Sequence, residues 1–318
     1  MIVISEDVWS AEFEALSESF PIVREPDLWS DKEALKAKLA DATALVVRNR
    51  TQVTEEIIAA APNLRIIARA GVGLDNIDVK AADKHGVVVA AALGINATAV
   101  GEQTVLMALA LSRKLIELDA STRLGEWNRK AGREITGRTW GLLGFGATAR
   151  ATAELLKGFK VNVLAYDPFA KPDASYLQSI NAEMVSMEKV ITESDYISIH
   201  LPATPETKDV INSQVLNQMK RAAIIVSVGR GEVINEADLE TALKTGVIAG
   251  AGLDVRAQEP PKDKRFADLN NVVLAPHVAG ITQESQTAIN QVLVSEIRAA
   301  LTGGAQRYAV GAVKQAKP

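Results

Sequence analysis

The sequence contains no cysteine among its 318 residues. This absence excludes disulfide bonds, thiolate metal ligands and cysteine nucleophiles, and no metal site is expected. Long apolar runs are also missing, so no window of about twenty uninterrupted apolar residues could span a membrane. The stretch from Met1 to Glu6 lacks a basic segment and is typical of a first β-strand rather than of a secretory signal. These features predict a cytoplasmic protein without membrane contact.

An excess of positive charge is missing as well. The 35 basic and 39 acidic side chains give a net charge of −4, which offers nucleic acid or an anionic membrane no electrostatic attraction. Apolar residues make up 47% of the chain and charged residues 23%, as in ordinary soluble globular proteins. A chain of this length exceeds one hydrophobic core, so two domains are expected.

Short apolar segments alternate with helical segments along most of the chain. This alternation predicts parallel sheets covered by helices on both faces, and hence an α/β protein with two doubly wound domains. The first series of expected strands covers 1–4, 22–24, 44–48, 65–70 and 87–91, and the second covers 139–143, 161–166, 196–201, 223–228, 249–253 and 272–275.

Two long helices are expected to join these series. The segment 98–116 is strongly apolar and free of proline, which predicts a buried connecting helix. A helix over 283–301 follows the second series and is expected to return to the first domain. The first domain is therefore predicted to be discontinuous, with residues 1–98 and 284–318, and the second to cover 99–283.

The second series opens with a glycine turn of characteristic surroundings. Gly144-Phe145-Gly146-Ala147-Thr148-Ala149 follows a strand and begins a helix, and the next strand ends at Asp167. Gly144 permits a tight turn, and Gly146 lets a pyrophosphate approach the helix N-terminus. Together these parts form the dinucleotide-binding βαβ unit of a Rossmann domain. Asp167 suits ribose hydroxyls and repels a 2′-phosphate, which favours NAD over NADP, although an isolated aspartate there would more often be a turn residue before proline.

The chain has three histidines, and their positions differ. His85 precedes Gly86 at an expected helix end, where it would cap carbonyl groups in solvent. His200 ends a strand and would either approach a nucleotide or face a loop. His277 follows the last strand, at the carboxyl edge where open α/β sheets bind ligands. An isolated histidine there would more often be structural.

Two neighbouring strand ends support a catalytic role for His277. Arg230 stands between Gly229 and Gly231 after one strand, and Glu259 follows the next strand. A guanidinium, a carboxylate and an imidazole are thus expected at one edge beside the cofactor. The alternatives are a surface glycine loop for Arg230 and a charged turn before proline for Glu259.

In these strand ends and their surroundings the sequence resembles the D-isomer-specific 2-hydroxyacid dehydrogenases. The resemblance rests on Gly229-Arg230-Gly231, on Leu253-Asp254-Val255 with Glu259-Pro260, and on Pro276-His277-Val278-Ala279-Gly280. It extends over nearly the whole chain, including the run from Arg69 to Asp78, which is most similar to the phosphoglycerate dehydrogenase branch. The chain stops too soon for the C-terminal regulatory domain that this branch often carries, so a short form is expected.

The resemblance implies a flavodoxin-like substrate domain, a Rossmann domain that binds NAD, and hydride transfer between a 2-keto acid and a 2-hydroxy acid. His277 would donate the proton, Glu259 would orient it, and Arg230 would bind the substrate carboxylate. Backbone N–H groups of Val72 and Gly73 would complete that carboxylate site. The cofactor would contact Gly144, Gly146, Ala147, Thr148, Asp167, Leu201, Val228, Gly229, Asp254 and Gly280.

The identity of the substrate depends on Arg48 and Arg50, which follow the expected strand 44–48. They would bind a phosphate or sulfonate, as in 3-phosphoglycerate or sulfolactate, or they form a solvated loop and the substrate is hydroxypyruvate or glyoxylate. The resemblance also implies a homodimer through residues 98–138. An NAD-binding corepressor and a Rossmann enzyme of other chemistry, such as alanine dehydrogenase, are the rival interpretations.

Overall fold

The computed structural model describes residues 1–317, which divide into two compact units. Unit 1 comprises Met1–Asn96 together with 282–317, and unit 2 comprises Ala97–Ile281. The chain therefore leaves unit 1, completes unit 2 and returns. The boundaries expected at residues 98 and 283 lie two residues beyond those of the structure.

Unit 1 contains a parallel sheet with the order β2-β1-β3-β4-β5, which is the flavodoxin-like arrangement. A short strand, β13, pairs with β5 in the antiparallel sense at one edge. The strands are β1 (Ile2–Ile4), β2 (Ile22–Arg24), β3 (Ala44–Val47), β4 (Ile66–Arg69), β5 (Val88–Ala91) and β13 (Ala309–Val310). β1, β3, β4 and β5 are buried along their whole length, as expected for strands covered on both faces.

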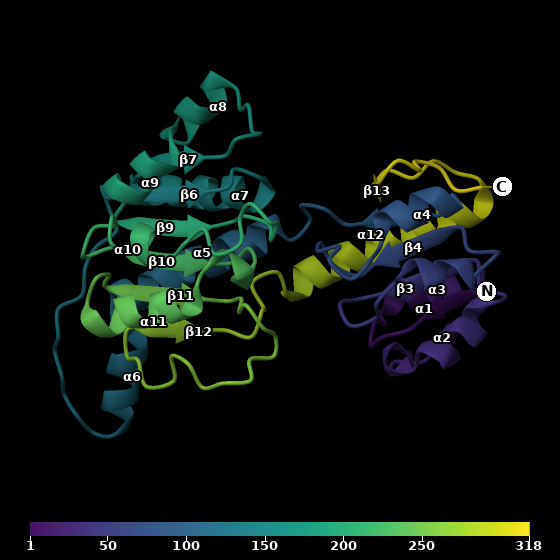
Figure 1. Cartoon of the computed structure of the whole chain (residues 1–318), viewed down its shortest axis with the longest axis horizontal. Coiled ribbons are helices and arrows are strands. Elements are labelled where there is room, and N and C mark those ends of the chain that lie inside the picture. Colours follow the sequence, from purple (N-terminus) through teal and green to yellow (C-terminus); the bar gives the residue numbers. More distant parts are fainter. Residues whose placement is uncertain (318) are drawn as a thin grey trace. The chain divides into compact units, whose positions relative to one another are not determined.

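Helices cover both faces of this sheet (Figure 1). On one face α1 (Ala11–Ser17) and α12 (Gln283–Thr302) bury apolar residues such as Phe13 and Leu293 against the strands. On the other face lie α2 (Lys32–Leu39), α3 (Glu55–Ala59) and α4 (Val79–His85), with a 3₁₀ turn at Leu28–Ser30. Thr282 caps α12 in a capping box with Ser285, and Gly303 ends it at φ 80°.

Unit 2 contains a seven-stranded sheet with the order β8-β7-β6-β9-β10-β11-β12, in which every pairing is parallel. The strand order reverses between β6 and β9, and ligands bind at such a switch point in doubly wound folds. The strands are β6 (Thr139–Leu143), β7 (Asn162–Tyr166), β8 (Ala182–Met184), β9 (Tyr196–Ile199), β10 (Ile224–Ser227), β11 (Gly250–Leu253) and β12 (Val272–Leu274).

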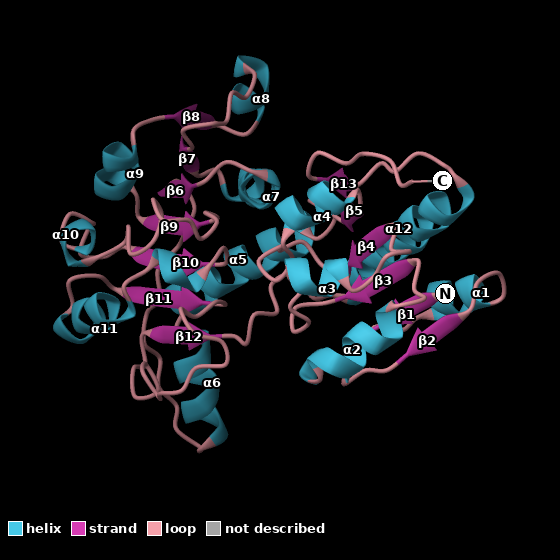
Figure 2. Cartoon of the chain, turned by 45° about the vertical axis from the view of Figure 1, so that its right-hand side comes forward, coloured by secondary structure: helices cyan, strands magenta, loops and turns pink. Residues whose placement is uncertain are grey.

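Figure 2 shows the two helical layers of unit 2 on either side of its sheet. One face is covered by α5 (Ala97–Ser112) and α7 (Ala147–Leu156), and the other by α9 (Met187–Glu193), α10 (Ser213–Leu216) and α11 (Glu236–Thr245). Beneath α5, the rings of Trp140 and Tyr196 stack with their centroids 5.2 Å apart. The remaining helices are α6 (Leu115–Arg123), α8 (Ala174–Ser179) and 3₁₀ turns at Lys157–Phe159 and Gly231–Val233.

The connecting helix expected over 98–116 is shorter than predicted. It ends at Ser112, and α6 begins after Lys114, which has a left-handed backbone with φ 54°. The carbonyl of Ser112 accepts a hydrogen bond from the Arg133 N–H instead of continuing the helix. A segment distant in sequence thus ends the helix, which local periodicity does not reveal. Within the described residues 1–317, no helix combines the length and the apolarity that a membrane span requires.

Candidate active site

The carboxyl ends of the parallel strands in unit 2 bring together most of the residues that the sequence singled out. Gly144 follows β6, Asp167 follows β7 and Leu201 follows β9, while Val228 and Gly229 follow β10. Asp254 directly follows β11, and Pro276-His277 follow β12 closely. Because neighbouring parallel strands end at the same edge, these residues share one side of the sheet.

The helix α7 begins with an open N-terminus. Gly146 is its N-cap and provides no side-chain cap, so the first N–H groups of the helix remain available to an anion. Gly144 has φ 89°, and a Cβ atom there would lie 3.1 Å from the His200 backbone. Gly144 therefore allows both the tight turn and the close approach between β6 and β9.

Asp167 is held in position by three backbone N–H groups. Phe145 donates to one carboxylate oxygen at 2.8 Å, and Phe169 and Ala170 donate to the other at 2.8 and 3.0 Å. Burial alone would raise the pKa of Asp167, but these hydrogen bonds outweigh it and lower the pKa. An ionised carboxylate beside an open helix N-terminus fits the ribose and the pyrophosphate of a dinucleotide.

His277 and Glu259 form a direct pair. The Nδ1 atom of His277 lies 2.6 Å from Oε2 of Glu259, and the two side chains are 47% and 36% exposed. The carboxylate therefore fixes the orientation of the imidazole ring. Within the described residues 1–317, Nε2 of His277 has no hydrogen-bond partner, so it is available to a ligand.

The pair changes the acidity of both groups. The hydrogen bond that the imidazole donates to Glu259 raises the pKa of His277 above its ordinary value, against an opposing effect of burial. Burial would raise the pKa of Glu259, but the contacts with His277 and the Arg256 N–H lower it. The imidazole is thus favoured in its protonated form.

Asp254 holds the backbone that carries His277. It is 1% exposed, and its carboxylate oxygens accept hydrogen bonds from the N–H groups of Val278 and Ala279, both at 2.9 Å. Its carbonyl accepts from the N–H of His277, whose φ is 55°. This left-handed conformation is strained for a non-glycine residue, and the Asp254 contacts stabilise it. The sequence indicated a cofactor contact for Asp254, but not this support of the His277 loop.

Arg230 owes its position to the glycines on both sides. A Cβ atom on Gly229 would lie 2.5 Å from the Leu201 carbonyl oxygen, and one on Gly231 would overlap the Arg256 backbone. Each glycine therefore allows the Arg230 loop to contact the neighbouring strand end. The Arg256 N–H, in turn, donates to Glu259 at 2.9 Å. Backbone packing thus links Arg230 to the pair formed by Glu259 and His277.

In unit 1 the residues proposed for the substrate lie on two adjacent strand ends. Arg48 and Arg50 follow β3, and Val72 and Gly73 follow β4, its neighbour in the sheet. Arg50 stacks over the Trp29 ring, with its guanidinium carbon 4.9 Å from the ring centroid. Within residues 1–317 the Arg48 guanidinium has no side-chain partner. The basic loop therefore keeps a cation available.

Two buried polar residues that the sequence did not single out support this edge of unit 1. The Glu6 carboxylate accepts hydrogen bonds from the N–H groups of residues 48–51. Burial would raise the pKa of Glu6, but these bonds lower it. Asn76 donates to the carbonyl groups of Arg48 and Thr51 and so connects the two loops. Asn76 lies in the run from Arg69 to Asp78 that carries the family resemblance, but nothing in that run or around Glu6 reveals these backbone contacts.

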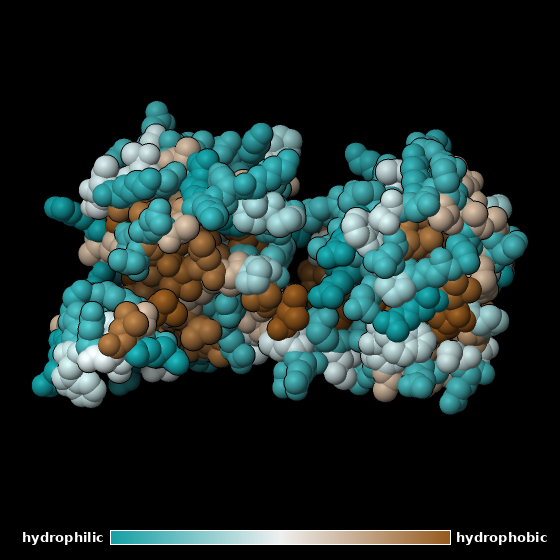
Figure 3. All heavy atoms as spheres, turned by 90° about the horizontal axis from the view of Figure 1, so that it is seen from below, coloured by the Kyte–Doolittle hydropathy of each residue, from teal (hydrophilic) through white to brown (hydrophobic). Residues whose placement is uncertain are grey.

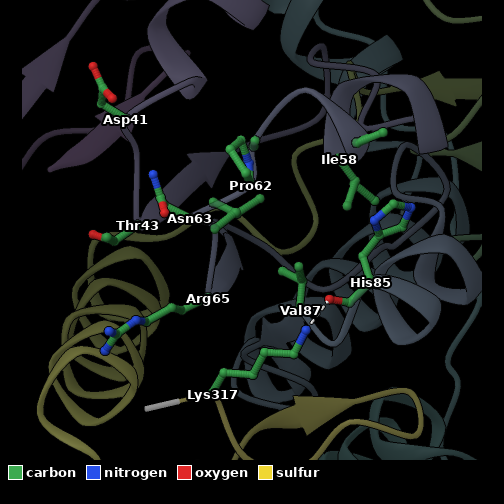
Figure 4. Close-up of a pocket in the computed structure, with 12 residues that line it drawn as sticks. Asp41, Thr43, Ile58, Pro62, Asn63, Arg65, His85, Val87 and Lys317 are labelled. Atoms are coloured by element: carbon green, nitrogen blue, oxygen red, sulfur yellow. Dashed lines mark hydrogen bonds between the residues drawn. The ribbon is translucent and has the colours of Figure 1, made fainter.

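A separate cavity of about 360 Å³ lies at the amino ends of the unit 1 strands, where Thr43, Arg65 and Val87 precede β3, β4 and β5 (Figure 4). His85 lines it, and Lys317 donates to the His85 carbonyl at 2.8 Å. His85 is half-buried rather than freely solvated. The cavity contains none of the predicted site residues; those of unit 1, Arg48, Arg50, Val72 and Gly73, lie at the opposite, carboxyl ends of β3 and β4.

Comparison with known proteins decides the family. Residues 105–279, more than half of the chain, match the model of the D-isomer specific 2-hydroxyacid dehydrogenase, NAD binding domain. The chain belongs to the D-2-hydroxyacid dehydrogenase family. Within this family the chain is 35% identical over 315 residues to D-3-phosphoglycerate dehydrogenase 2, chloroplastic, of Arabidopsis thaliana, covering 98% of this chain and 50% of that protein. The D-3-phosphoglycerate dehydrogenase of Methanocaldococcus jannaschii is 38% identical over 275 residues, which cover 86% of this chain and 52% of that protein.

Solved structures of the family match over nearly their full length. A glyoxylate reductase from Paecilomyes thermophila has a TM-score of 0.88 at 27% identity, and 97% of each chain is covered. An NADPH-dependent glyoxylate/hydroxypyruvate reductase from Sinorhizobium meliloti, solved with NADP and malonate, has a TM-score of 0.88 at 26% identity, with 100% of this chain and 98% of that chain covered. The predicted two-domain α/β fold is confirmed, while the chain spans about half the length of the curated relatives it matches.

Proposed function

We propose that the chain is an NAD-dependent D-2-hydroxyacid dehydrogenase that interconverts a small 2-keto acid and the corresponding 2-hydroxy acid. The observation that carries this proposal is the His277–Glu259 pair at 2.6 Å. This pair and Arg230 follow three adjacent strands of the sheet that carries Asp167 and the open end of α7. Bound NAD supplies or accepts the hydride.

The protein side chains stabilise the developing charge and transfer the proton in this reaction. During keto acid reduction, negative charge develops on the carbonyl oxygen, and protonated His277 donates a proton from Nε2 to that oxygen. Glu259 keeps the ring oriented through Nδ1 and favours its charged form. Arg230 binds the substrate carboxylate and polarises the carbonyl through its planar guanidinium. In the oxidation direction His277 accepts the proton.

We propose that unit 1 contributes substrate contacts through its two loops. The N–H groups of Val72 and Gly73 would bind the carboxylate, and Arg48 and Arg50 would bind a second anionic group of the substrate. The similarity to D-3-phosphoglycerate dehydrogenases supports a phosphorylated or sulfonated three-carbon acid. The structural similarity to glyoxylate and hydroxypyruvate reductases supports the alternative of a small acid with a neutral tail.

A substrate panel tests both alternatives. NADH oxidation would be followed by absorbance with phosphohydroxypyruvate, sulfopyruvate, hydroxypyruvate, glyoxylate and pyruvate. We expect the largest kcat/KM with an acid that carries an anionic tail. The charge-removing variant Arg48→Gln should lower kcat/KM for these acids more than kcat/KM for glyoxylate. A preference for glyoxylate in the wild type would assign the alternative substrate. NADH binding without turnover of any acid would instead favour a corepressor-like protein or other Rossmann chemistry.

The Asp167→Ala variant tests cofactor preference. Asp167 is predicted to accept hydrogen bonds from ribose hydroxyls and to repel a 2′-phosphate, so its removal should weaken NADH binding by about ten-fold and improve NADPH binding. Measured Kd values for both nucleotides would show this change in ratio. An unchanged ratio would remove the role from Asp167, and the Asp41→Ala variant, at an exposed carboxylate of unit 1, controls for loss of charge.

The Glu259→Gln variant tests the pH dependence. Because the pKa of wild-type His277 is raised, keto acid reduction should persist from acidic pH until the pH passes that pKa, and then decline. Glutamine removes the charge that raises this pKa, so the decline should move to lower pH. A pH profile of kcat/KM would measure the change, and an unmoved alkaline limb would contradict the proposed pairing.

We also propose that the protein forms a homodimer in the cytoplasm. Apolar side chains gather on the face of unit 2 seen in Figure 3. Among residues 98–138, Ile116 and Trp127 are 59% and 83% exposed, and such exposed apolar residues are typical of interaction surfaces. Sedimentation equilibrium tests the dimer, and a monomer at micromolar concentration would contradict it.

A further inference from the structure

His200 lies at the end of β9 between two hydroxyl groups. Its Nε2 atom is 3.0 Å from Ser198 Oγ, and its Nδ1 atom is 3.1 Å from Thr148 Oγ1 in the first turn of α7. Ser198 Oγ is also 2.9 Å from the Trp140 indole nitrogen. Trp140, Ser198, His200 and Thr148 therefore form one continuous chain of hydrogen bonds from the core to the nucleotide end of the sheet.

The backbone holds His200 tightly in this chain. A Cβ atom on Gly144 would lie 3.1 Å from the His200 carbonyl atoms, and one on Gly229 would lie 3.2 Å from the same carbonyl carbon. Gly144 follows β6 and Gly229 follows β10, the two strands on either side of β9. The backbone of His200 is thus confined from both sides, which fixes the position from which its imidazole reaches the two hydroxyl groups.

The donors and acceptors of this chain select one arrangement of hydrogens. The Trp140 indole can only donate, so Ser198 Oγ accepts from it. Ser198 is fully buried, and its hydroxyl hydrogen finds an acceptor only if Nε2 of His200 carries no hydrogen. The hydrogen of a neutral imidazole is then on Nδ1, and it is donated to Thr148 Oγ1. The opposite tautomer would leave the Ser198 hydroxyl hydrogen without an acceptor, which is unfavourable in a protein core.

The imidazole is also kept neutral. Burial lowers the pKa of His200 to about 3, because the packed surroundings disfavour an imidazolium. His200 therefore carries a single N–H hydrogen at neutral pH and offers no positive charge to a ligand. His200 can therefore orient a hydrogen bond at the nucleotide end of the sheet, but it adds no charge there.

The first turn of α7 makes such a contribution useful. Ala147 and Ala149 carry no polar group, and Arg150 is directed away because its Nε donates to the Phe145 carbonyl while its guanidinium lies over the Phe145 and Tyr176 rings. Thr148 is therefore the polar side chain of this turn. With its oxygen accepting from His200, the Thr148 hydroxyl hydrogen is left to be donated outward, next to the open N–H groups of the helix.

We propose that His200 is a positioning residue that donates to Thr148 and thereby presents the Thr148 hydroxyl as a hydrogen-bond donor to a nucleotide pyrophosphate. This inference rests on the proposed binding of NAD. The neutral chain of hydrogen bonds gives the N-terminus of α7 one additional hydrogen-bond donor that is directed outward, without adding a positive charge. It assigns a role to a histidine that lies outside the catalytic pair.

Binding measurements on four variants test the proposal. By calorimetry with NADH and ADP-ribose, Thr148→Val should weaken binding by about ten-fold, the effect of one hydrogen bond to a charged group, whereas Thr148→Ser should remain near wild type. His200→Leu should weaken both ligands, whereas His200→Asn, whose amide can replace Nδ1–H, should restore most of the affinity. Adenosine, which lacks phosphate, should bind all variants equally. Unchanged ADP-ribose binding by Thr148→Val would overturn the proposal, while a wild type that binds no NADH would instead overturn the proposed function.

The wild-type protein provides a second readout that does not depend on the folding of variants. With ¹⁵N-labelled histidine there are only three imidazoles to assign. We expect His200 to show a protonated Nδ1 and an unprotonated Nε2 throughout pH 5 to 8, with and without NADH. A hydrogen on Nε2 of His200 would reverse the direction of the hydrogen bond to Thr148 and overturn the proposal.

Discussion

Replacement of His277 by alanine is expected to lower kcat for keto acid reduction by about 10²- to 10⁴-fold, the usual contribution of a general acid. The Kd for NADH should stay near the wild-type value, because the imidazole contacts Glu259 and Asp254 supports the backbone around it. The loss should therefore appear in the chemical step. Steady-state kinetics combined with NADH fluorescence titration would separate the two quantities.

A matched variant makes this result specific. His85→Ala removes a half-buried imidazole from the cavity at the amino ends of the unit 1 strands, and it should leave kcat unchanged. If His277→Ala lost NADH affinity in parallel with kcat, the side chain would be supporting the cofactor site rather than transferring a proton. Turnover near the wild-type level would exclude His277 as the acid.

The Arg230→Lys variant is expected to have the second largest effect. Lysine keeps the positive charge but cannot make two parallel hydrogen bonds to a carboxylate, so we expect kcat/KM to fall by about 10²-fold. Both a higher KM and a lower kcat should contribute, because Arg230 is proposed to bind the carboxylate and to polarise the carbonyl. The glycines on either side should keep the loop in place, since they lie close to backbone atoms of Leu201 and Arg256, which the substitution does not change.

The control for Arg230→Lys is the same substitution at Arg221. Arg221 is exposed and precedes β10, at the end of that strand opposite to Arg230, so Arg221→Lys should leave kcat/KM unchanged. NADH affinity should also be unchanged in Arg230→Lys. Equal catalytic efficiency in the wild type and Arg230→Lys would show that a point charge suffices and that the planar guanidinium has no special role.

Local patterns in the sequence predict much of this fold. The expected strands of both units are present, although β8 was not among them, and α12 differs from its expected range by one residue at its C-terminal end. The glycine turn and Asp167 were recognisable because each has a fixed place in a βαβ unit. The strand-end positions of Arg230, Glu259 and His277 follow from the same alternation of strands and helices.

Features that depend on distant contacts were not predictable in the same way. The end of α5 depends on Arg133, whose backbone N–H donates a hydrogen bond to the Ser112 carbonyl. β13 forms only because the chain returns to pair with β5, and two residues give no strand signal of their own. The support of His277 by Asp254 and of the Arg48 loop by Glu6 comes from buried carboxylates that accept backbone hydrogen bonds. Such contacts depend on how the whole chain folds, and the spacing of residues along the sequence does not reveal them.

The return of the chain to unit 1 has a consequence for the order of events on the ribosome. Strands β1 to β5 are synthesised first, but α12, which buries Ile289, Leu293 and Ile297 against one face of their sheet, is translated only after all of unit 2. Unit 2 is contiguous in sequence and is able to complete its own core earlier. During this interval the nascent first sheet exposes an apolar face, which makes it a substrate for chaperones and the stage most vulnerable to aggregation.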